Sequence, residues 1–248
     1  MNWMTRGLGL GVLGMICAAA PGALAAPVTI LVDFGGAATD PADDPARTWN
    51  NLSTALGTTN TGVLADLKAT NGTTTAADIA MVARFNGVNA AGTTASSLYP
   101  ADATNDSLYG NQEAFGIGAN ITPIFKIAGL NPDEVYDLTF YASRVVGGAN
   151  PDNRTARYTL LGDTTSFVEL NATDNINNTI TATGVGADSN GEIRVTITAG
   201  TGNNNANHFA YLGVLTIAGE IAPVPEPTTG ALLVGGAMLA LRRRARRA

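Results

Sequence analysis

The sequence predicts an all-β protein: an antiparallel β-sandwich of jelly-roll type, flanked by an N-terminal signal helix and a short C-terminal hydrophobic helix. Three observations predict the sandwich. Apolar and polar residues alternate over short runs, which is the period of a half-buried strand. Turn-forming residues separate the runs. Only 14% of the residues are charged and 29 are glycine, a composition typical of β-rich proteins rather than helical ones.

The alternation predicts strands at nine places along the chain. In order they are Val28–Phe34, Ile79–Phe85, Ile121–Ile127, Val135–Tyr141, Arg157–Leu161, Phe167–Leu170, Thr179–Thr183, Ile193–Thr198 and Phe209–Ile217. The pair Asn190-Gly191 before a strand is a hairpin signal. Only Gly62–Ala69 has the pattern of a short helix. The segment Leu52–Asn120 holds either long loops at one end of the sandwich or strands that the pattern does not reveal.

The N-terminal residues have the three parts of a secretion signal. Arg6 lies in a short basic region, an apolar run covers Leu8–Ala20, and small residues Ala23 and Ala25 form a cleavage site. Cutting after Ala25 avoids placing Pro27 first in the mature chain. We therefore expect residues 1–25 to be a signal peptide handled by the Sec machinery, 26–220 to form the sandwich domain, and 221–248 to be a sorting segment.

The C-terminal residues combine Pro225-Glu226-Pro227, an apolar stretch over Gly230–Leu241 and an arginine cluster over Arg242–Arg247. The stretch is shorter than the about 20 residues that a spanning helix needs. In order and spacing this segment resembles the PEP-CTERM sorting signal. The resemblance implies recognition by an exosortase, a membrane-embedded protease that cuts near the motif. It also implies a Gram-negative host and only transient membrane contact, so that the protein reaches the cell surface or the extracellular space.

The net charge of −6 hides an acidic body. Between Pro27 and Glu220 there are 8 Lys and Arg against 19 Asp and Glu, a net charge of −11. An acidic body repels phosphates, which argues against nucleic acid and anionic lipid as partners. The one cysteine, Cys17, lies in the signal peptide, so the mature chain has neither a disulfide nor a thiol nucleophile.

The body also resembles, by pattern rather than by a diagnostic motif, bacterial jelly-roll modules of the galactose-binding-like type. The segments that carry the resemblance are Val32–Gly35, Trp49–Asn51, Tyr99-Pro100, Asp106–Tyr109, Gly129–Pro132, Tyr136–Arg144 and His208–Ile217. The resemblance implies a sandwich that binds glycans. It supplies no catalytic residue, and fold alone does not decide function.

Catalytic and metal-binding patterns are weak. His208 is the one histidine, and no Gly-x-Ser-x-Gly elbow accompanies it. It is either a ligand contact or general base, or a half-buried residue that closes a hairpin, and we favour the second. Zinc would need several His or Cys ligands. We expect no cofactor, with one alternative: a structural calcium on the loop acids Asp40, Asp43 and Asp44.

Two sets of residues are candidates for a ligand face. The first is aromatic, Trp49, Tyr99 and Tyr109, because exposed rings stack on sugar faces. The second is polar and basic: Arg144, Asn153, Arg154 and Arg157. Arg144 ends the predicted strand Tyr136–Ser143, and Arg154 and Arg157 open the next, so the two strand ends can meet at one rim. The alternatives are core aromatic residues and arginines paired with the surplus carboxylates.

These features favour a non-catalytic surface or secreted protein that associates with extracellular polysaccharide. Two other functions stay open at this point: a secreted esterase or glycosidase acting on glycans, and a structural matrix protein without a specific ligand. The body contains 19 acids, enough for carboxylate pairs of the kind that glycosidases use.

Overall fold

The computed structural model describes residues 26–36, 41 and 44–224. The expected terminal helices, the cleavage residues Ala23 and Ala25, and the sorting motif Pro225-Glu226-Pro227 lie outside the described residues. Asp40 and Asp43 also lie outside them.

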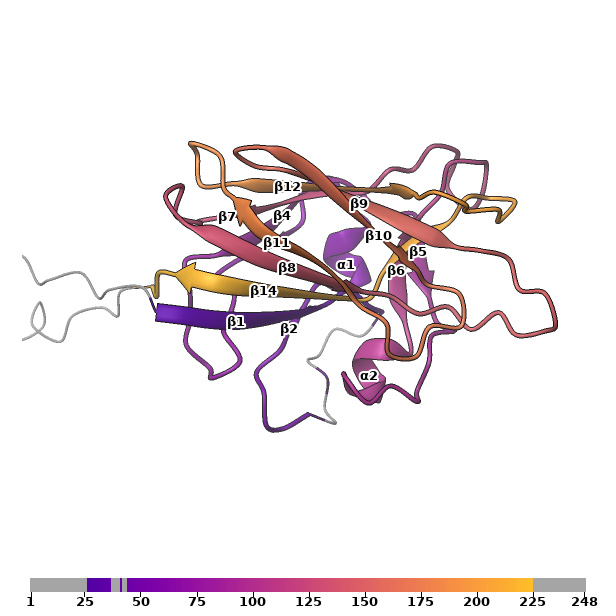
Figure 1. The fold of residues 1–248 in the computed structure, drawn as a ribbon, viewed down its shortest axis with the longest axis horizontal. Helices are drawn as coiled ribbons and strands as arrows, with labels where there is room; N and C mark the ends of the chain where they lie inside the picture. Colours follow the sequence, from indigo (N-terminus) through magenta and orange to yellow (C-terminus); the bar gives the residue numbers. More distant parts are fainter. Residues whose placement is uncertain (1–25, 37–40, 42–43, 225–248) are drawn as a thin grey trace, which may run out of the picture.

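The described part of the chain folds into an antiparallel β-sandwich with a small additional sheet (Figure 1). One main sheet has the order β11-β8-β14-β1-β2 and comprises Ile180–Gly186, Val135–Tyr141, Val214–Ile221, Ala26–Asp33 and Asn50–Asn51. The other has the order β10-β9-β12-β7-β4-β3 and comprises Thr165–Asn171, Thr155–Leu161, Ile193–Ala199, Ile124–Ala128, Asp78–Ala83 and Val63–Leu64. From β7 to β12 the chain crosses repeatedly from one main sheet to the other, as in a jelly roll. The predicted fold class is confirmed.

The core lies between the two main sheets, because each sheet turns one set of alternating side chains inward. Along β8, Tyr136, Leu138 and Phe140 are fully buried. Phe140 stacks on Tyr158 of β9 in the facing sheet, with ring centroids 4.3 Å apart and planes 8° from parallel. This contact fixes the distance between the sheets at their centre. It also places the end of β8 against the middle of β9.

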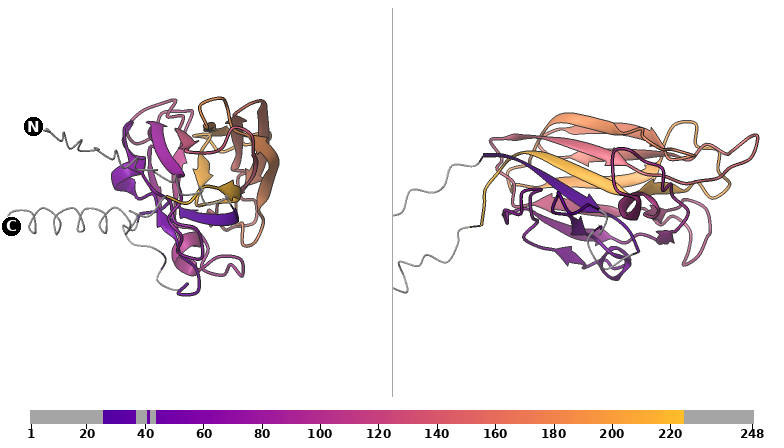
Figure 2. Two further views of the ribbon diagram at one scale, coloured as in Figure 1. Left: turned by 90° about the vertical axis from the view of Figure 1, so that its left-hand side faces the viewer. Right: turned by 90° about the horizontal axis from the view of Figure 1, so that it is seen from below.

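The first and last long strands are neighbours. β1 pairs antiparallel with β14 along its whole length, from Ala26 opposite Ile221 to Asp33 opposite Val214. Figure 2 shows the beginning of β1 and the end of β14 side by side at one end of the sandwich. The chain therefore enters and leaves the described domain at the same end.

The segment Leu52–Asn120 contains short elements that the sequence pattern did not reveal. They are α1 (Thr54–Gly57), β3 (Val63–Leu64), β5 (Gly87–Asn89), α2 (Ala101–Thr104) and β6 (Ser107–Gly110). β5 and β6 join β13 (Ala210–Leu212) in a small third sheet of order β13-β6-β5. No helix within the described residues is long and apolar enough to cross a membrane.

The predicted helix over Gly62–Ala69 is wrong. Asp66 has a φ of 53°, in the left-handed region, which interrupts a helix. The next residue, Leu67, is fully buried, and its N–H donates to the carbonyl of Ala77 at 2.8 Å. Its own carbonyl accepts from the N–H of Thr75 at 2.9 Å. Pairing across a turn and burial in the core thus override the local helical pattern.

Candidate functional site

The third sheet forms the floor of a pocket at the end of the sandwich away from the chain ends. Tyr109 of β6 and Tyr211 of β13 lie directly opposite each other in the register. Their strand neighbours Leu108 and Leu212 are fully buried in the main core. Because successive side chains alternate across a strand, the two tyrosines point to the opposite face of the sheet. The core therefore fixes the orientation of both tyrosine rings.

Two arginines and several aromatic rings stand around this floor. The pocket is open to solvent and has a volume of about 190 Å³. Its lining residues are Val88, Asn89, Ala90, Tyr109, Phe115, Arg144, Arg154, Phe209 and Tyr211. This volume is below the roughly 300–1,000 Å³ of sites for drug-sized ligands, so the pocket accommodates a single small ring or a chain end.

The aromatic wall is built from edge-to-face contacts. Phe209 packs against Tyr109 with centroids 5.2 Å apart and planes at 83°. It also packs against Phe115, at 4.9 Å and 89°. Such geometry sets the positive edge of one ring on the negative face of the next, which stabilises the arrangement. Phe115 is 45% exposed, so part of its ring remains available for contact.

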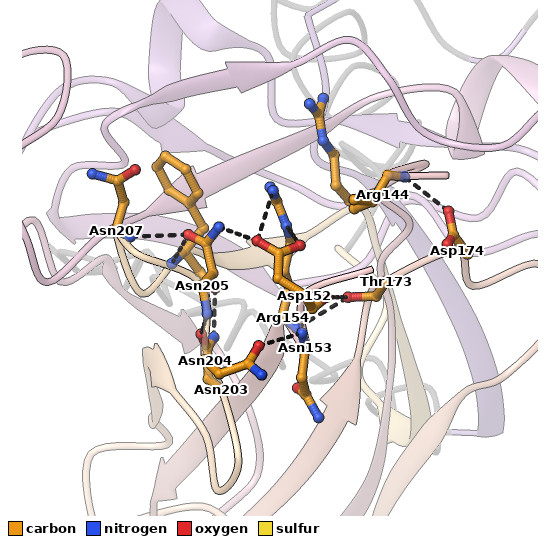
Figure 3. Close-up of polar contacts among 12 residues, drawn as sticks. Arg144, Asp152, Asn153, Arg154, Thr173, Asp174, Asn203, Asn204, Asn205 and Asn207 are labelled. Atoms are coloured by element: carbon orange, nitrogen blue, oxygen red, sulfur yellow. Dashed lines mark hydrogen bonds and ion pairs between the residues drawn. The ribbon is translucent and has the colours of Figure 1, made fainter. Parts of the chain in front are cut away.

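Arg154 is held rigidly by an ion pair and a phenol. Its Nε and Nη2 donate to the two carboxylate oxygens of Asp152 at 2.9 and 3.1 Å, and its Nη1 donates to the Tyr211 hydroxyl at 2.7 Å. Asn205 Nδ2 also donates to Asp152. Figure 3 shows this chain of contacts running from Asn207 through Asn205 and Asp152 to Arg154. The side chain of Arg154 is 12% exposed.

The pKa values in this cluster follow from the same contacts. The hydrogen bond from Arg154 lowers the pKa of Asp152, and Asn205 adds to the effect. Burial works against the charge of Arg154, but its bonds to Asp152 and Tyr211 outweigh burial and raise its pKa. Burial raises the pKa of Tyr211, although Arg154 and Arg144 act in the opposite direction. At neutral pH the cluster therefore holds a carboxylate, a guanidinium and a neutral phenol.

Arg144 lies on the other side of the pocket and has a different environment. Its Nη1 donates to Asn89 Oδ1 at 2.6 Å. Asn89 is 6% exposed, and its amide nitrogen donates to Ser107 Oγ at 3.0 Å and to the Ser143 carbonyl at 3.2 Å. These bonds orient the Asn89 oxygen toward the guanidinium. Among the described residues Arg144 forms no salt bridge, unlike Arg154.

The expected meeting of Arg144 and Arg154 at one rim is confirmed, because both line the pocket. Arg157 does not join them. Its Nε donates to Glu169 at 2.7 Å, and its guanidinium lies 4.3 Å from the centre of the Phe167 ring on the outer surface of β9 and β10.

Asn153 and His208 shape the surroundings of the pocket but do not line it. The N–H of Asn153 donates to Asn204 Oδ1 at 2.6 Å, and its own Oδ1 accepts from the N–H of Thr155 at 2.8 Å, which fixes the start of β9. His208 has a left-handed φ of 48°, and its N–H donates to the Asn205 carbonyl at 2.9 Å. It therefore shapes the turn that leads into β13, which favours its structural interpretation.

The three candidate aromatic residues do not form one face, which corrects that expectation. Trp49 is 2% exposed and packs with Tyr99 and Tyr141, in a cluster separate from the one that Tyr109 joins. Its indole N–H donates to Asp44 Oδ2 at 2.7 Å. A ring covered on its faces and bonded at its nitrogen contributes to the core rather than to a ligand surface. Of the three, only Tyr109 lines the pocket.

The loop acids proposed as calcium ligands are represented among the described residues by Asp44. Its carboxylate accepts from Arg47 Nε and from Trp49 Nε1, both at 2.7 Å. Within the described part of the chain, no group of three or more His, Cys, Asp or Glu side chains is placed to hold a metal ion.

Sequence reasoning missed four residues that define the pocket: Asn89, Phe115, Phe209 and Tyr211. The alternation of residues in Phe209–Ile217 predicts a strand, but it does not indicate which side of the strand faces a pocket. Asn89 and Phe115 lie in the segment that lacked clear strands.

Comparisons with known proteins give only distant likenesses. No family model matches the chain, and no curated protein matches it. One similar solved structure is TmCBM61 in complex with beta-1,4-galactotriose, with 11% identity, a TM-score of 0.28, and coverage of 56% of this chain and 81% of that chain. Another is the ANXUR1 extracellular domain from Arabidopsis thaliana, with 15% identity and a TM-score of 0.44; the match covers 80% of this chain but only 51% of that one. At these scores neither likeness assigns a ligand or an activity to the chain.

Proposed function

We propose that this protein is a non-catalytic module that binds polysaccharide, seating one sugar residue in the pocket on the third sheet. The observation that carries this proposal is the convergence of aromatic rings with forked donors in one small open pocket. Ring faces such as that of Phe115 pack on the C–H face of a sugar. The guanidinium of Arg144 and the hydroxyl of Tyr109 are placed to bond sugar oxygens.

The chemistry of the lining supports binding rather than turnover. Its polar groups are guanidinium, amide and phenol. Burial raises the pKa of Tyr109, and burial likewise raises that of Tyr211. Both phenols therefore keep their protons at neutral pH, and the raised pKa of Arg154 keeps its guanidinium charged. Groups that stay in one protonation state act as hydrogen-bond donors and acceptors rather than as general acids or bases.

A pair of exposed phenylalanines gives a matched test of the site. Phe115 is 45% exposed in the pocket, and Phe167 is 57% exposed on β10 outside it. On a glycan array probed with the full-length chain, we expect Phe115→Ala to lose about tenfold or more of the native signal, since covering an exposed Phe side chain contributes about 1.5–3 kcal/mol. Phe167→Ala should bind as the native chain does. Equal losses in both variants, or no glycan bound by the native chain, would refute the proposal.

The same proposal includes export and sorting to the cell surface. The signal-like residues 1–25 and the motif Pro225-Glu226-Pro227 support it, together with the resemblance of the C-terminal segment to an exosortase substrate. Replacing Pro225, Glu226 and Pro227 with alanine should block processing in a host that carries an exosortase. The measurement is the size and cell fraction of the chain by immunoblot. Unchanged processing and location would contradict the sorting part and leave the binding part standing.

A further inference from the structure

Arg144 is an uncompensated cation in the pocket. Of the five N–H donors of a guanidinium, one has a partner among the described residues, namely Nη1 on Asn89. The Nε atom is shielded from solvent and has no hydrogen-bond partner. This side of the guanidinium has therefore lost its water without gaining an acceptor, which is costly for a charged group.

Asp174 contacts the backbone of Arg144, but its carboxylate does not neutralise the Arg144 side chain. The N–H of Asp174 donates to the Arg144 carbonyl at 2.8 Å, so the two residues are linked through their main chains. The Asp174 carboxylate instead accepts from the N–H groups of Val146 at 2.8 Å and Gly147 at 3.1 Å. Figure 3 shows the Arg144 guanidinium extending away from Asp174. The backbone contact thus fixes the base of the Arg144 side chain while its charge remains unpaired.

Among the described bases without a salt bridge, Arg144 alone is partly buried, whereas Lys68, Arg84 and Arg194 are all exposed. The body carries 19 acids against 8 bases, so carboxylates are abundant, and Arg154 and Arg157 both have one. Arg154 lines the same pocket, but its charge is neutralised by Asp152, which binds the guanidinium on the side away from Tyr211. The pocket therefore holds a net positive charge within an acidic protein, directly beside the aromatic wall.

From these contacts we infer that the sugar seated in the pocket carries a carboxylate, as in a hexuronic acid, and that Arg144 binds that carboxylate. The inference rests on the proposed function, since it names the class of saccharide for the same pocket. A planar guanidinium fork matches the two oxygens of a carboxylate, and the resulting bonds are charge-assisted. The open Nη end of Arg144 supplies the donors, while the wall formed by Phe115 and Phe209 contacts the ring.

Isothermal titration of the full-length chain tests the inference with pairs of sugars that differ at one carbon. The probes are D-glucuronate against D-glucose and D-galacturonate against D-galactose. We expect one of the two acids to bind at least about tenfold more tightly than its neutral parent. Added salt should weaken the acid more than the neutral sugar.

Three variants test whether Arg144 causes the preference for the acidic sugar. Arg144→Gln should reduce the affinity for the acid far more than that for the neutral sugar, so that the preference for the acid disappears. Arg144→Lys keeps the charge but not the fork, so it should recover only part of the preference. Arg194→Gln is the matched control, because it removes the same charge from an exposed position on β12. It should leave the preference intact.

The outcomes separate this inference from the proposed function. Equal affinity for the acid and its neutral parent overturns the inference and leaves the function standing. An equal loss in the Arg194→Gln variant also overturns it, because long-range charge then explains the preference. Binding of D-glucose 6-phosphate as tightly as D-glucuronate overturns the carboxylate class. If no probe binds and no glycan binds on the array, both the inference and the proposed function are refuted.

Discussion

Replacing Tyr211 with phenylalanine isolates one charge-assisted hydrogen bond at the site. The change removes the hydroxyl that accepts from Arg154 Nη1 at 2.7 Å but keeps the ring, so it opens no sizeable cavity. The Tyr211 carbonyl still accepts from the Tyr158 hydroxyl at 2.6 Å, which preserves the position of β13. Hydrogen bonds to charged groups contribute about 1.5–3 kcal/mol to the free energy of unfolding.

The expected loss lies at the lower end of that range. Asp152 keeps two bonds to Arg154 and still compensates its charge, which limits the loss. The Arg154 side chain is only 12% exposed, so water replaces the hydroxyl poorly and the loss does not fall below that range. We expect about 1.5 kcal/mol, which corresponds to a fall of about 3–6 °C in the thermal midpoint of a domain of this size. Thermal unfolding followed by circular dichroism measures it.

Tyr99→Phe is the matched control for this prediction. It removes a hydroxyl that lies 3.3 Å from Thr216 Oγ1, a longer bond between neutral groups. We expect it to lower the midpoint by about 2 °C or less. If Tyr211→Phe unfolds within about 1 °C of the native chain, or no earlier than Tyr99→Phe, the hydroxyl does not stabilise Arg154 and the reasoning fails.

Two further predictions concern the geometry and the charge of the pocket. A Cβ at Gly87 would lie 3.2 Å from the Tyr109 hydroxyl oxygen, so Gly87→Ala should displace the tyrosine ring. We expect this change to weaken saccharide binding about threefold or more, as measured by titration. An unchanged affinity would contradict the prediction. The pKa of Asp152 lies below its ordinary 3.8, so its pairing with Arg154 stabilises the fold above that pH and is lost as the pH falls through the lowered value. The difference in unfolding free energy between the native chain and Asp152→Asn should therefore shrink as the pH drops below 3.8, measured by urea titration, whereas a constant difference would exclude this linkage.

The main sheets could be predicted because each strand buries one face. The strand expected at Val135–Tyr141 is β8 with the same bounds, since its buried and exposed residues alternate nearly throughout. The strand expected at Phe167–Leu170 lies within β10, Thr165–Asn171. In such strands every second side chain is buried in the core, so the sequence alternates between apolar and polar residues and this alternation identifies the strand.

The short elements could not be predicted for a related reason. β5 and β6 contain three and four residues, too few to show a period. Their position follows from pairing with β13, which lies about a hundred residues further along the chain. One-turn helices such as α1 carry no amphipathic pattern either. Tertiary contacts therefore determine this segment, and local sequence does not record them.

The pocket was predictable where the chain itself brings residues together. Arg144 follows β8 and Arg154 precedes β9, so the single connection between two strands that are consecutive in the chain places both at the same rim. Asn89 is 55 residues away from Arg144, and only the third sheet brings them into contact. For Trp49 the sequence left a ligand surface and a small core as alternatives, because an aromatic residue in a loop fits both, and the structure places it in a small core.

The pairing of β1 with β14 determines how the domain carries mechanical load. Ile221 lies opposite Ala26 at one end of β14, and Val214, which follows Tyr211 of the pocket by three residues, lies at the other end, about 24 Å away. Tension applied between a ligand in the pocket and the chain at Ile221 therefore runs along β14. Its hydrogen bonds with β1 and β8 are stretched together in shear rather than opened one at a time. A saccharide chain bound in the pocket as proposed would thus load β14 along its length.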